Sequence, residues 1–248
     1  PKLELLVDEA IDQDSKIKLK NYLEKKLYEL INTELSDLVN LSKAKFKNRY
    51  VRALCYQLFE NNGVIKRESI YQMIKSISKE DRVGLRKAGI KIGRYHIFLP
   101  RMLKPNAVDV RIKLWKLFYP EDKKYDIPKS GLNFLKNEVP QNNKFLLICG
   151  FENFNKFYVR VDILERFFIK IIENSKDGVF KINSDMINLI GCSKENFFKL
   201  LDLMNYKPKK GEEFFIYKPK PDGNKRLKKN KKITKNNPFS KLSEIRFT

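Results

Sequence analysis

The stretch NSDMINLIGCSKENFFKLLDLMNYKPKKGEEFFIY, residues 183–217, decides the fold of the C-terminal half of this chain. Asn183 and Ser193 each precede a helical apolar pattern and are good N-cap residues, and Gly191 between them suits a tight turn. Two short strands, joined by a basic loop, are predicted after the second helix, at 206–208 and 214–217. The stretch therefore predicts two helices followed by a β-hairpin.

A third helix is predicted just before this stretch. We interpret Asp162 and Glu165 as its capping residues, and apolar side chains recur along it at helical spacing. Two short strands are expected in front of it, at 144–149 and 157–160. Three helices followed by a hairpin is the element order of a winged helix. We therefore expect a winged-helix-like domain over residues 144–218.

The first 119 residues predict a helical accessory domain. A long amphipathic helix is expected from Asp12 to about Lys45, and Gly63 is placed to end a second helix in a left-handed conformation. Further helices are expected at 68–77, at 78–88 with Ser78 as the cap, and from Pro105 to Pro120, with one strand at 90–99.

Two segments have few periodic apolar positions. Residues 120–143 are interpreted as a linker, and residues 219–248 as a basic disordered tail. The expected fold class is therefore mainly α with small β elements (α+β). Its parts are the accessory domain (1–119), the linker, the winged-helix-like domain and the tail.

The chain carries 52 basic and 30 acidic side chains, a formal net charge of +22. Lysine and arginine displace counterions from phosphates, so this charge favours a polyanionic partner such as RNA or DNA. Most of the basic residues are lysine, however, and AT-rich codon usage alone can enrich lysine. The three cysteines lie far apart, and no apolar run is long enough for a membrane span. A cytoplasmic location without membrane contact is expected.

Catalytic and nucleotide-binding motifs are missing from the sequence. It contains neither a GxxxxGK[ST] loop nor a GxGxxG cluster after a predicted strand. The only histidine, His96, lies in a predicted strand without an adjacent nucleophile, so we interpret it as structural or as a polar contact. No catalytic residue, metal ligand or bound cofactor is predicted, and the chain alone should not hydrolyse ATP.

The segment from Asp81 to Lys104 is the first candidate for nucleic-acid contact. Gly84, Gly89 and Gly93 allow a backbone to approach closely, and arginine matches phosphate oxygens with two hydrogen bonds. The alternative is a solvated helix face and strand edge, since charged surface residues are common. The predicted phosphate-binding residues here are Arg82, Arg86, Lys91, Arg94, Arg101 and Lys104.

Lysines of the winged-helix-like domain form a second candidate set. The helix after Ser193 also carries Glu195 and Asp202 and has no arginine, which argues against the reading of base edges. The alternative is a protein contact, because winged helices also serve as docking modules, and the tail could be merely solubilising. The predicted contacts to phosphate or sugar are Lys194, Lys199, Lys207, Lys209 and Lys210.

Several of these segments resemble, in order along the chain, the C-terminal half of alphaproteobacterial superfamily 2 helicases. Those helicases are in turn similar to the RNA helicase of the mitochondrial degradosome. The resemblance spans nearly the whole chain and is most specific from Asp81 to Pro105, whereas the tail departs from the relatives' longer tails, which are rich in Ala, Pro, Glu and Arg. The segments that carry it are RALCYQLFENNGVIKR (52–67), EDRVGLRKAGIKIGRYHIFLPRMLKP (80–105), VRVDILERF (159–167), DMINLIGCSKENFFKLLDLMNYK (185–207) and NNPFSKLSEI (236–245).

The resemblance implies a preceding motor of two RecA-like domains that binds ATP and Mg²⁺, and the start at Pro1 without an initiator methionine agrees with a fragment. This region would grip single-stranded RNA or DNA beside that motor, with RNA favoured, by phosphate contacts and by stacking on aromatics such as Tyr95 or Phe98. The alternative is a protein-docking module that tethers a helicase to a nuclease or the ribosome. The weakly basic helix after Ser193 disfavours a free-standing transcription regulator.

Overall fold

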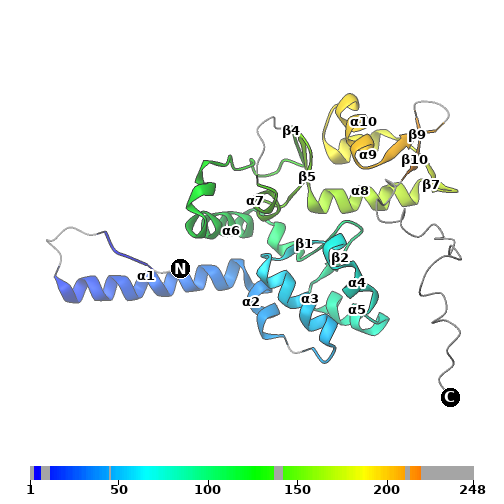
Figure 1. The fold of residues 1–248 in the computed structure, drawn as a ribbon. Coiled ribbons are helices and arrows are strands. Elements are labelled where there is room, and N and C mark those ends of the chain that lie inside the picture. Colours follow the sequence, from blue (N-terminus) through cyan, green and yellow to red (C-terminus); the bar gives the residue numbers. More distant parts are fainter. Residues whose placement is uncertain (1–2, 7–11, 45, 137–141, 210–212, 219–248) are drawn as a thin grey trace, which may run out of the picture.

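A computed structural model of the chain describes residues 3–6, 12–44, 46–136, 142–209 and 213–218. Within these ranges the fold is mainly α-helical with small antiparallel sheets, as the sequence predicts (Figure 1). No helix in the described ranges is both long and apolar enough to cross a bilayer. The expected tail, part of the expected linker and Lys210 fall outside the described residues.

The first unit combines six helices with a three-stranded antiparallel sheet of strand order β1-β3-β2. Its helices are α1 (Gln13–Glu34), α2 (Ser36–Lys43), α3 (Arg49–Glu60), α4 (Tyr71–Lys75), α5 (Lys79–Lys87) and α6 (Pro105–Phe118), with 3-10 turns η1 (Arg67–Ile70) and η2 (Pro100–Leu103). Its strands are β1 (Val64–Lys66), β2 (Lys91–Ile92) and β3 (His96–Phe98). The single strand predicted over 90–99 is therefore wrong: the residues form a hairpin, because 93–95 make a turn.

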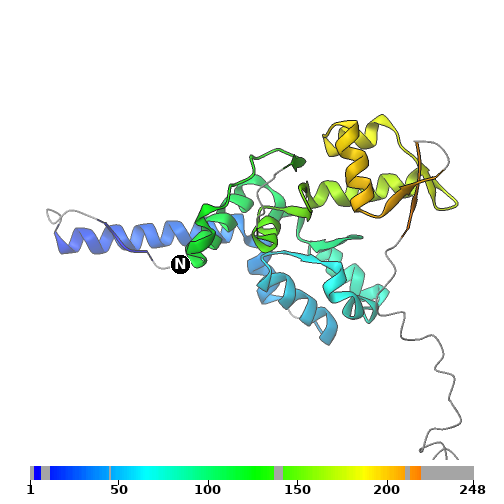
Figure 2. The same cartoon turned by 45° about the horizontal axis from the view of Figure 1, so that its top comes forward.

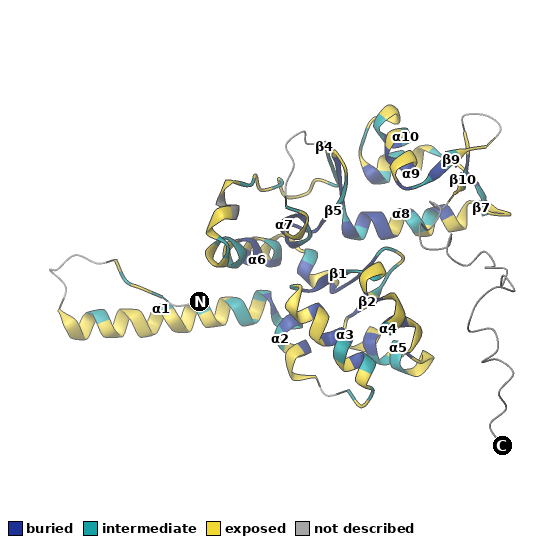
Figure 3. Ribbon diagram, viewed as in Figure 1, coloured by how far each residue is buried: buried dark blue, intermediate teal, exposed yellow. Residues whose placement is uncertain are grey.

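Local signals begin and end these helices largely as predicted. The Ser78 side chain accepts a hydrogen bond from the Asp81 backbone N–H (3.1 Å), and Pro105 occupies the first turn of α6. Gly63 follows α3 with a φ of +87°. The predicted long N-terminal helix is divided at Leu35, whose side chain turns into the core, and α1 before it buries none of its residues (Figure 3).

The second unit begins inside the expected linker. That segment contains the 3-10 turn η3 (Pro120–Lys124) and the strand β4 (Phe134–Lys136), which joins a sheet of order β4-β6-β5 with β5 (Phe151–Phe154) and β6 (Phe157–Arg160). Residues 144–149, predicted as a strand, form the helix α7 (Asn143–Ile148) instead. The Asn142 side chain caps it by accepting from the Lys144 N–H, and a short apolar run fits either structure.

The remainder of the second unit has the predicted order of three helices and a hairpin. These are α8 (Val161–Glu173), α9 (Ser184–Ile190), α10 (Lys194–Leu203), β9 (Tyr206–Pro208) and β10 (Phe214–Tyr217). Asn183 and Ser193 cap α9 and α10, and Gly191 ends α9 with a φ of +78°. We did not predict the hairpin of β7 (Ser175–Lys176) and β8 (Val179–Lys181), which completes a sheet of order β7-β8-β10-β9.

The two units pack directly on each other. Phe98 of β3 is buried with Val161, where α8 begins, and Ile112 of α6 packs in one cluster with Phe145 of α7. In two views of the molecule, α8 lies between the sheet of the first unit and the α9–α10 pair (Figures 1 and 2). Helices α7 and α8 are therefore elements that the second unit presents to the first.

Candidate nucleic-acid interface

A cleft of about 680 Å³ opens where the two units meet, and we call it the interface cleft. The first unit supplies β1, η1, α4 and the β2–β3 turn, and the second supplies β5, the C-terminal end of α10 and β10. Side chains far apart in the sequence are thus gathered around one concave surface. The cleft is lined by Lys66, Arg67, Glu68, Tyr71, Arg94, Tyr95, His96, Glu152, Phe154, Leu203, Met204, Asn205 and Tyr217.

The β2–β3 turn carries Arg94, a predicted phosphate-binding residue, into this cleft. Arg94 is exposed, and its guanidinium lies 5.7 Å from the ring centre of Phe168 in α8. It forms no ion pair within the part of the chain that the structure describes. The neighbouring Arg67 is engaged, because its guanidinium donates to the Gly93 carbonyl oxygen (2.8 Å). Arg94 is therefore the cation of the cleft that is open to an anion.

The turn that presents Arg94 is held by Glu165 of α8. This carboxylate accepts hydrogen bonds from the backbone N–H groups of Arg94 (2.6 Å), Tyr95 (2.8 Å) and His96 (2.7 Å). A Cβ at Gly93 would collide with the same carboxylate. Two interpretations are thereby corrected: Glu165 does not cap α8, and the close approach that Gly93 permits is that of a protein carboxylate, which occupies the space expected for a phosphate.

A chain of charged groups, buried except for Lys66, forms the floor of the cleft. His96 is 1% exposed, and its Nε2 lies 2.7 Å from Oε2 of Glu152 in β5. The other oxygen of Glu152 accepts from the Lys66 ammonium, and His96 Nδ1 lies 3.6 Å from Glu165. The interpretation of His96 as a buried polar contact agrees with this geometry.

This arrangement shifts the pKa of each titrating member. Burial lowers the pKa of His96, but the hydrogen bonds and charges of Glu152 and Glu165 outweigh burial and raise it above its usual value. Burial raises the pKa of Glu152 and of Glu165, yet the net shift of both is downward, because His96, Lys66 and the backbone N–H donors favour the ionised carboxylates. The cluster is therefore a set of mutually stabilised charges that fastens the two units together.

Aromatic side chains complete the cleft, and of the two predicted ones Tyr95 lines it while Phe98 does not. Phe98 is 1% exposed and cannot stack on a base, so that prediction is wrong. Tyr95 is half-buried, with its ring edge against Phe168 and its hydroxyl 3.2 Å from that of Tyr206. Two cleft residues that we did not predict, Tyr71 and Tyr217, are 48% and 42% exposed. Both rings are partly exposed: the Lys75 ammonium lies over the Tyr71 ring, 4.5 Å from its centre, and the Tyr217 ring packs against Tyr206, with 5.4 Å between ring centres.

The other predicted cations are distributed over both units. Arg101 pairs with Asp37, Lys207 pairs with Asp202, and the Arg82 guanidinium donates to the Ile74 carbonyl oxygen, so these three have internal partners. The remaining ones are exposed and form no ion pair among the described residues, although Lys91 and Lys194 lie over the rings of Phe98 and Phe198. They are Arg86, Lys91, Lys104, Lys194, Lys199 and Lys209, and Lys210 lies outside the described ranges.

Lys66, Glu152 and the two cleft tyrosines were not selected from the sequence. The adjacent cations Lys66 and Arg67 follow a short apolar run and could have been chosen on that signal. No local pattern links Glu152 to His96, because their contact joins strands of different units. The cleft could therefore not have been assembled from spacing alone.

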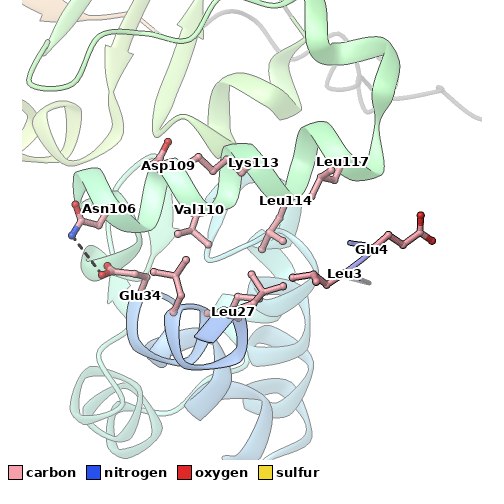
Figure 4. A pocket seen from close by; sticks show the side chains of 12 residues that line it. Leu3, Glu4, Leu27, Glu34, Asn106, Asp109, Val110, Lys113, Leu114 and Leu117 are labelled. Carbon is pink, nitrogen blue, oxygen red and sulfur yellow. Dashed lines mark hydrogen bonds and ion pairs between the residues drawn. The ribbon is translucent and has the colours of Figure 1, made fainter. Parts of the chain in front are cut away.

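A second concave surface lies between α1 and α6 (Figure 4). Its volume is about 550 Å³, and apolar side chains of both helices face each other across it, among them Leu27 and Leu114. Near its end the exposed Leu117 and Phe118 extend the apolar surface. We call this surface the α1–α6 groove.

Neither a metal site nor a nucleotide-binding loop is found in the parts of the chain that the structure describes. Among the described residues, no group of three or more histidine, cysteine, aspartate or glutamate side chains is suited to hold a metal ion, and the sequence offers no phosphate-binding glycine loop for ATP. Comparison with protein-family models, with functionally described proteins and with solved structures found no match.

Proposed function

We propose that this protein binds single-stranded nucleic acid across the interface cleft. The observation that carries the proposal is that one cleft is lined both by Arg94, an exposed arginine without an ion-pair partner among the described residues, and by the partly exposed rings of Tyr71 and Tyr217. A guanidinium can hold a phosphate with two hydrogen bonds, and a tyrosine ring can stack on an unpaired base. A cleft that combines both suits an unpaired strand, since bases in a duplex are already stacked.

Exposed cations outside the cleft extend this binding. Arg86, Lys91 and Lys104 of the first unit, and Lys194, Lys199 and Lys209 of the second, have no carboxylate partner in the described parts of the chain. Each would add affinity through counterion release without reading the sequence of the strand. We expect this affinity to fall steeply with salt.

In its wider setting, we propose that the region is the accessory C-terminal part of an ATP-dependent helicase, with RNA favoured as the substrate. The sequence resemblance supports this, and RecA-like motor domains would be its first partner. ATP and Mg²⁺ would belong to that motor and supply the energy for strand separation. The residues of this chain would grip the strand and take no part in hydrolysis, in keeping with the missing phosphate-binding loop.

The test is fluorescence-anisotropy titration of labelled single- and double-stranded RNA and DNA of about 15 nucleotides over a salt series. Arg94→Ala should weaken single-strand binding about tenfold and reduce the salt slope by about 1. Tyr71→Ala and Tyr217→Ala should each weaken binding with little change in that slope. The matched control is Arg166→Ala, which removes an exposed arginine outside the cleft lining. Equal, small effects of Arg94→Ala and Arg166→Ala would reject binding in the cleft.

A second candidate function is that of a protein-docking module which tethers a helicase to a nuclease or the ribosome. The α1–α6 groove favours it, because its apolar lining and the exposed Leu117 and Phe118 form a surface of the kind that binds proteins (Figure 4). Capture of such a partner would depend little on salt. Replacing Leu117 and Phe118 by Ser would abolish it while leaving the affinity for a single strand unchanged.

A further inference from the structure

Arg94 of the interface cleft belongs to the first unit, but the backbone of the turn that carries it is held by the second unit. Arg94 follows Gly93 in the β2–β3 turn of the first unit. The carboxylate that accepts the N–H groups of Arg94, Tyr95 and His96 belongs to Glu165 in α8 of the second unit, and Glu165 is 2% exposed. Three consecutive backbone hydrogen bonds of the turn therefore depend on the packing of the two units against each other.

The two carboxylate oxygens of Glu165 accept different numbers of these hydrogen bonds. Oε2 accepts from Arg94, and Oε1 accepts from both Tyr95 and His96. A neighbouring ring of the same helix, Phe168, also lies against the Arg94 guanidinium. Helix α8 thus contacts both the backbone and the side chain of Arg94.

Separation of the units would leave these donors without their acceptor. Unpaired N–H groups in an apolar surrounding are unfavourable, so the turn would rearrange until water or other groups satisfied them. The direction in which Arg94 projects would no longer be defined. A second connection, from Glu152 of β5 to His96 of β3, crosses the same boundary and would be lost with it.

We propose that Glu165 is a positioning residue that orients Arg94, so that strand binding in the cleft and packing of the two units are thermodynamically coupled. The inference rests on the proposed function, because it assumes that Arg94 contacts the bound strand. Coupling is reciprocal: if unit packing improves the affinity for the strand, a bound strand must stabilise unit packing by the same factor. The packing of the two units would then be more stable with a bound strand than without it.

Glu165→Gln is the decisive substitution. Glutamine keeps the size of the side chain but has only one acceptor oxygen. That oxygen can accept either from both Tyr95 and His96 or from Arg94. The amide N–H₂ then faces the backbone N–H that has lost its acceptor. The matched control is Glu173→Gln, which makes the same charge change at an exposed position of α8. Anisotropy titrations with a labelled single strand would compare the wild-type chain with both variants, with Arg94→Ala, and with the double variant Glu165→Gln/Arg94→Ala.

We expect Glu165→Gln to weaken binding about as much as Arg94→Ala, roughly tenfold, and the double variant to be no weaker than Arg94→Ala alone. Such non-additivity separates positioning of Arg94 from general loss of structure. Additive losses, or a Glu165→Gln affinity equal to that of Glu173→Gln, would overturn the inference while Arg94→Ala still supports the proposed function. An unchanged affinity of Arg94→Ala would instead reject the proposed function itself.

If Glu165→Gln does not fold, the inference can still be tested on the wild-type chain. Backbone amide exchange of Arg94, Tyr95 and His96 would be followed by NMR with and without a saturating single strand. Coupling predicts that the strand slows exchange at all three amides, because it stabilises the units in their packed state. Unchanged exchange at these amides in the bound complex would overturn the inference.

Discussion

Replacement of Glu152 by glutamine tests the buried charge cluster that joins the two units. Glu152 contacts two cations: His96, which is 1% exposed, and Lys66, whose side chain is 42% exposed. Glutamine keeps the shape of the side chain and removes its charge. The substitution therefore leaves His96 without its closest charged partner while it disturbs the packing very little.

The two contacts differ in the free energy that they contribute. The Lys66 ammonium can be hydrated once its partner is neutral, so its share of the loss is small, between 0 and about 1 kcal/mol, as for surface ion pairs. The hydrogen bond to protonated His96 is buried and charge-assisted, and such bonds contribute about 1.5–3 kcal/mol. We expect Glu152→Gln to reduce the free energy of unfolding by about 2 kcal/mol at pH 5.5.

The loss should depend on pH with a defined sign. Because the folded pKa of His96 is raised, its stabilising contribution is complete below the unfolded value of 6.5 and is lost as pH rises through the higher folded pKa. The folded pKa values of Glu152 and Glu165 are lowered, so their contribution is complete above 4.5 and is lost as pH falls through the folded values. The difference between wild type and variant should be largest between pH 4.5 and 6.5 and smaller at pH 9.

Urea unfolding followed by the fluorescence of Trp115, the single tryptophan, and by circular dichroism would give these free energies. Glu173→Gln again serves as the control for the charge change, because Glu173 is exposed. If Glu152→Gln were as stable as this control at pH 5.5, or if its deficit were larger at pH 9, the interpretation of the cluster would be refuted.

Three further predictions concern stability and can be measured by the same unfolding assay. Gly93→Ala should lower the free energy of unfolding by about 1–3 kcal/mol, since its Cβ would collide with Glu165, and an unchanged stability would mean that the turn can move away. Phe167→Ala, in the core of the second unit at 0% exposure, should lower it by about 3–5 kcal/mol; less than 1 kcal/mol would contradict the packing. Gly191→Ala should lower it by about 1 kcal/mol, because φ there is +78° while an added Cβ would make only an ordinary contact with the Asn133 Cβ at 4.0 Å, and a stabilised variant would show that the left-handed turn is absent.

Helix ends were the most predictable part of this protein. Ser78, Asn183 and Ser193 were predicted as N-caps, and each accepts a hydrogen bond from a backbone N–H three residues later. Gly63 and Gly191 were placed after helices, and both adopt a positive φ. These features depend on residues a few positions apart, so a single sequence contains the information needed to predict them.

Predictions failed where a neighbour distant in the sequence decided the outcome. Glu165 was assigned to the start of its own helix, but its carboxylate is satisfied by a turn in the other unit. Phe98 was predicted as a stacking residue, yet packing against Val161 buries it. The apolar run at 144–149 was predicted as a strand but forms a helix. The prediction failed because a short buried apolar run fits either conformation.

Apart from the β7–β8 hairpin, the order of elements after Val161 could be predicted from the sequence, as could the mainly helical class and the excess of basic side chains. These follow from local periodicity, capping and composition. The three-dimensional structure was needed to learn which predicted cations are paired within the protein and which aromatic rings stay exposed. The physical reason is that exposure and charge pairing are set by packing between units: α8 brings Glu165 and Phe168 to Arg94, while other contacts engage Arg101 and Lys207 within the protein.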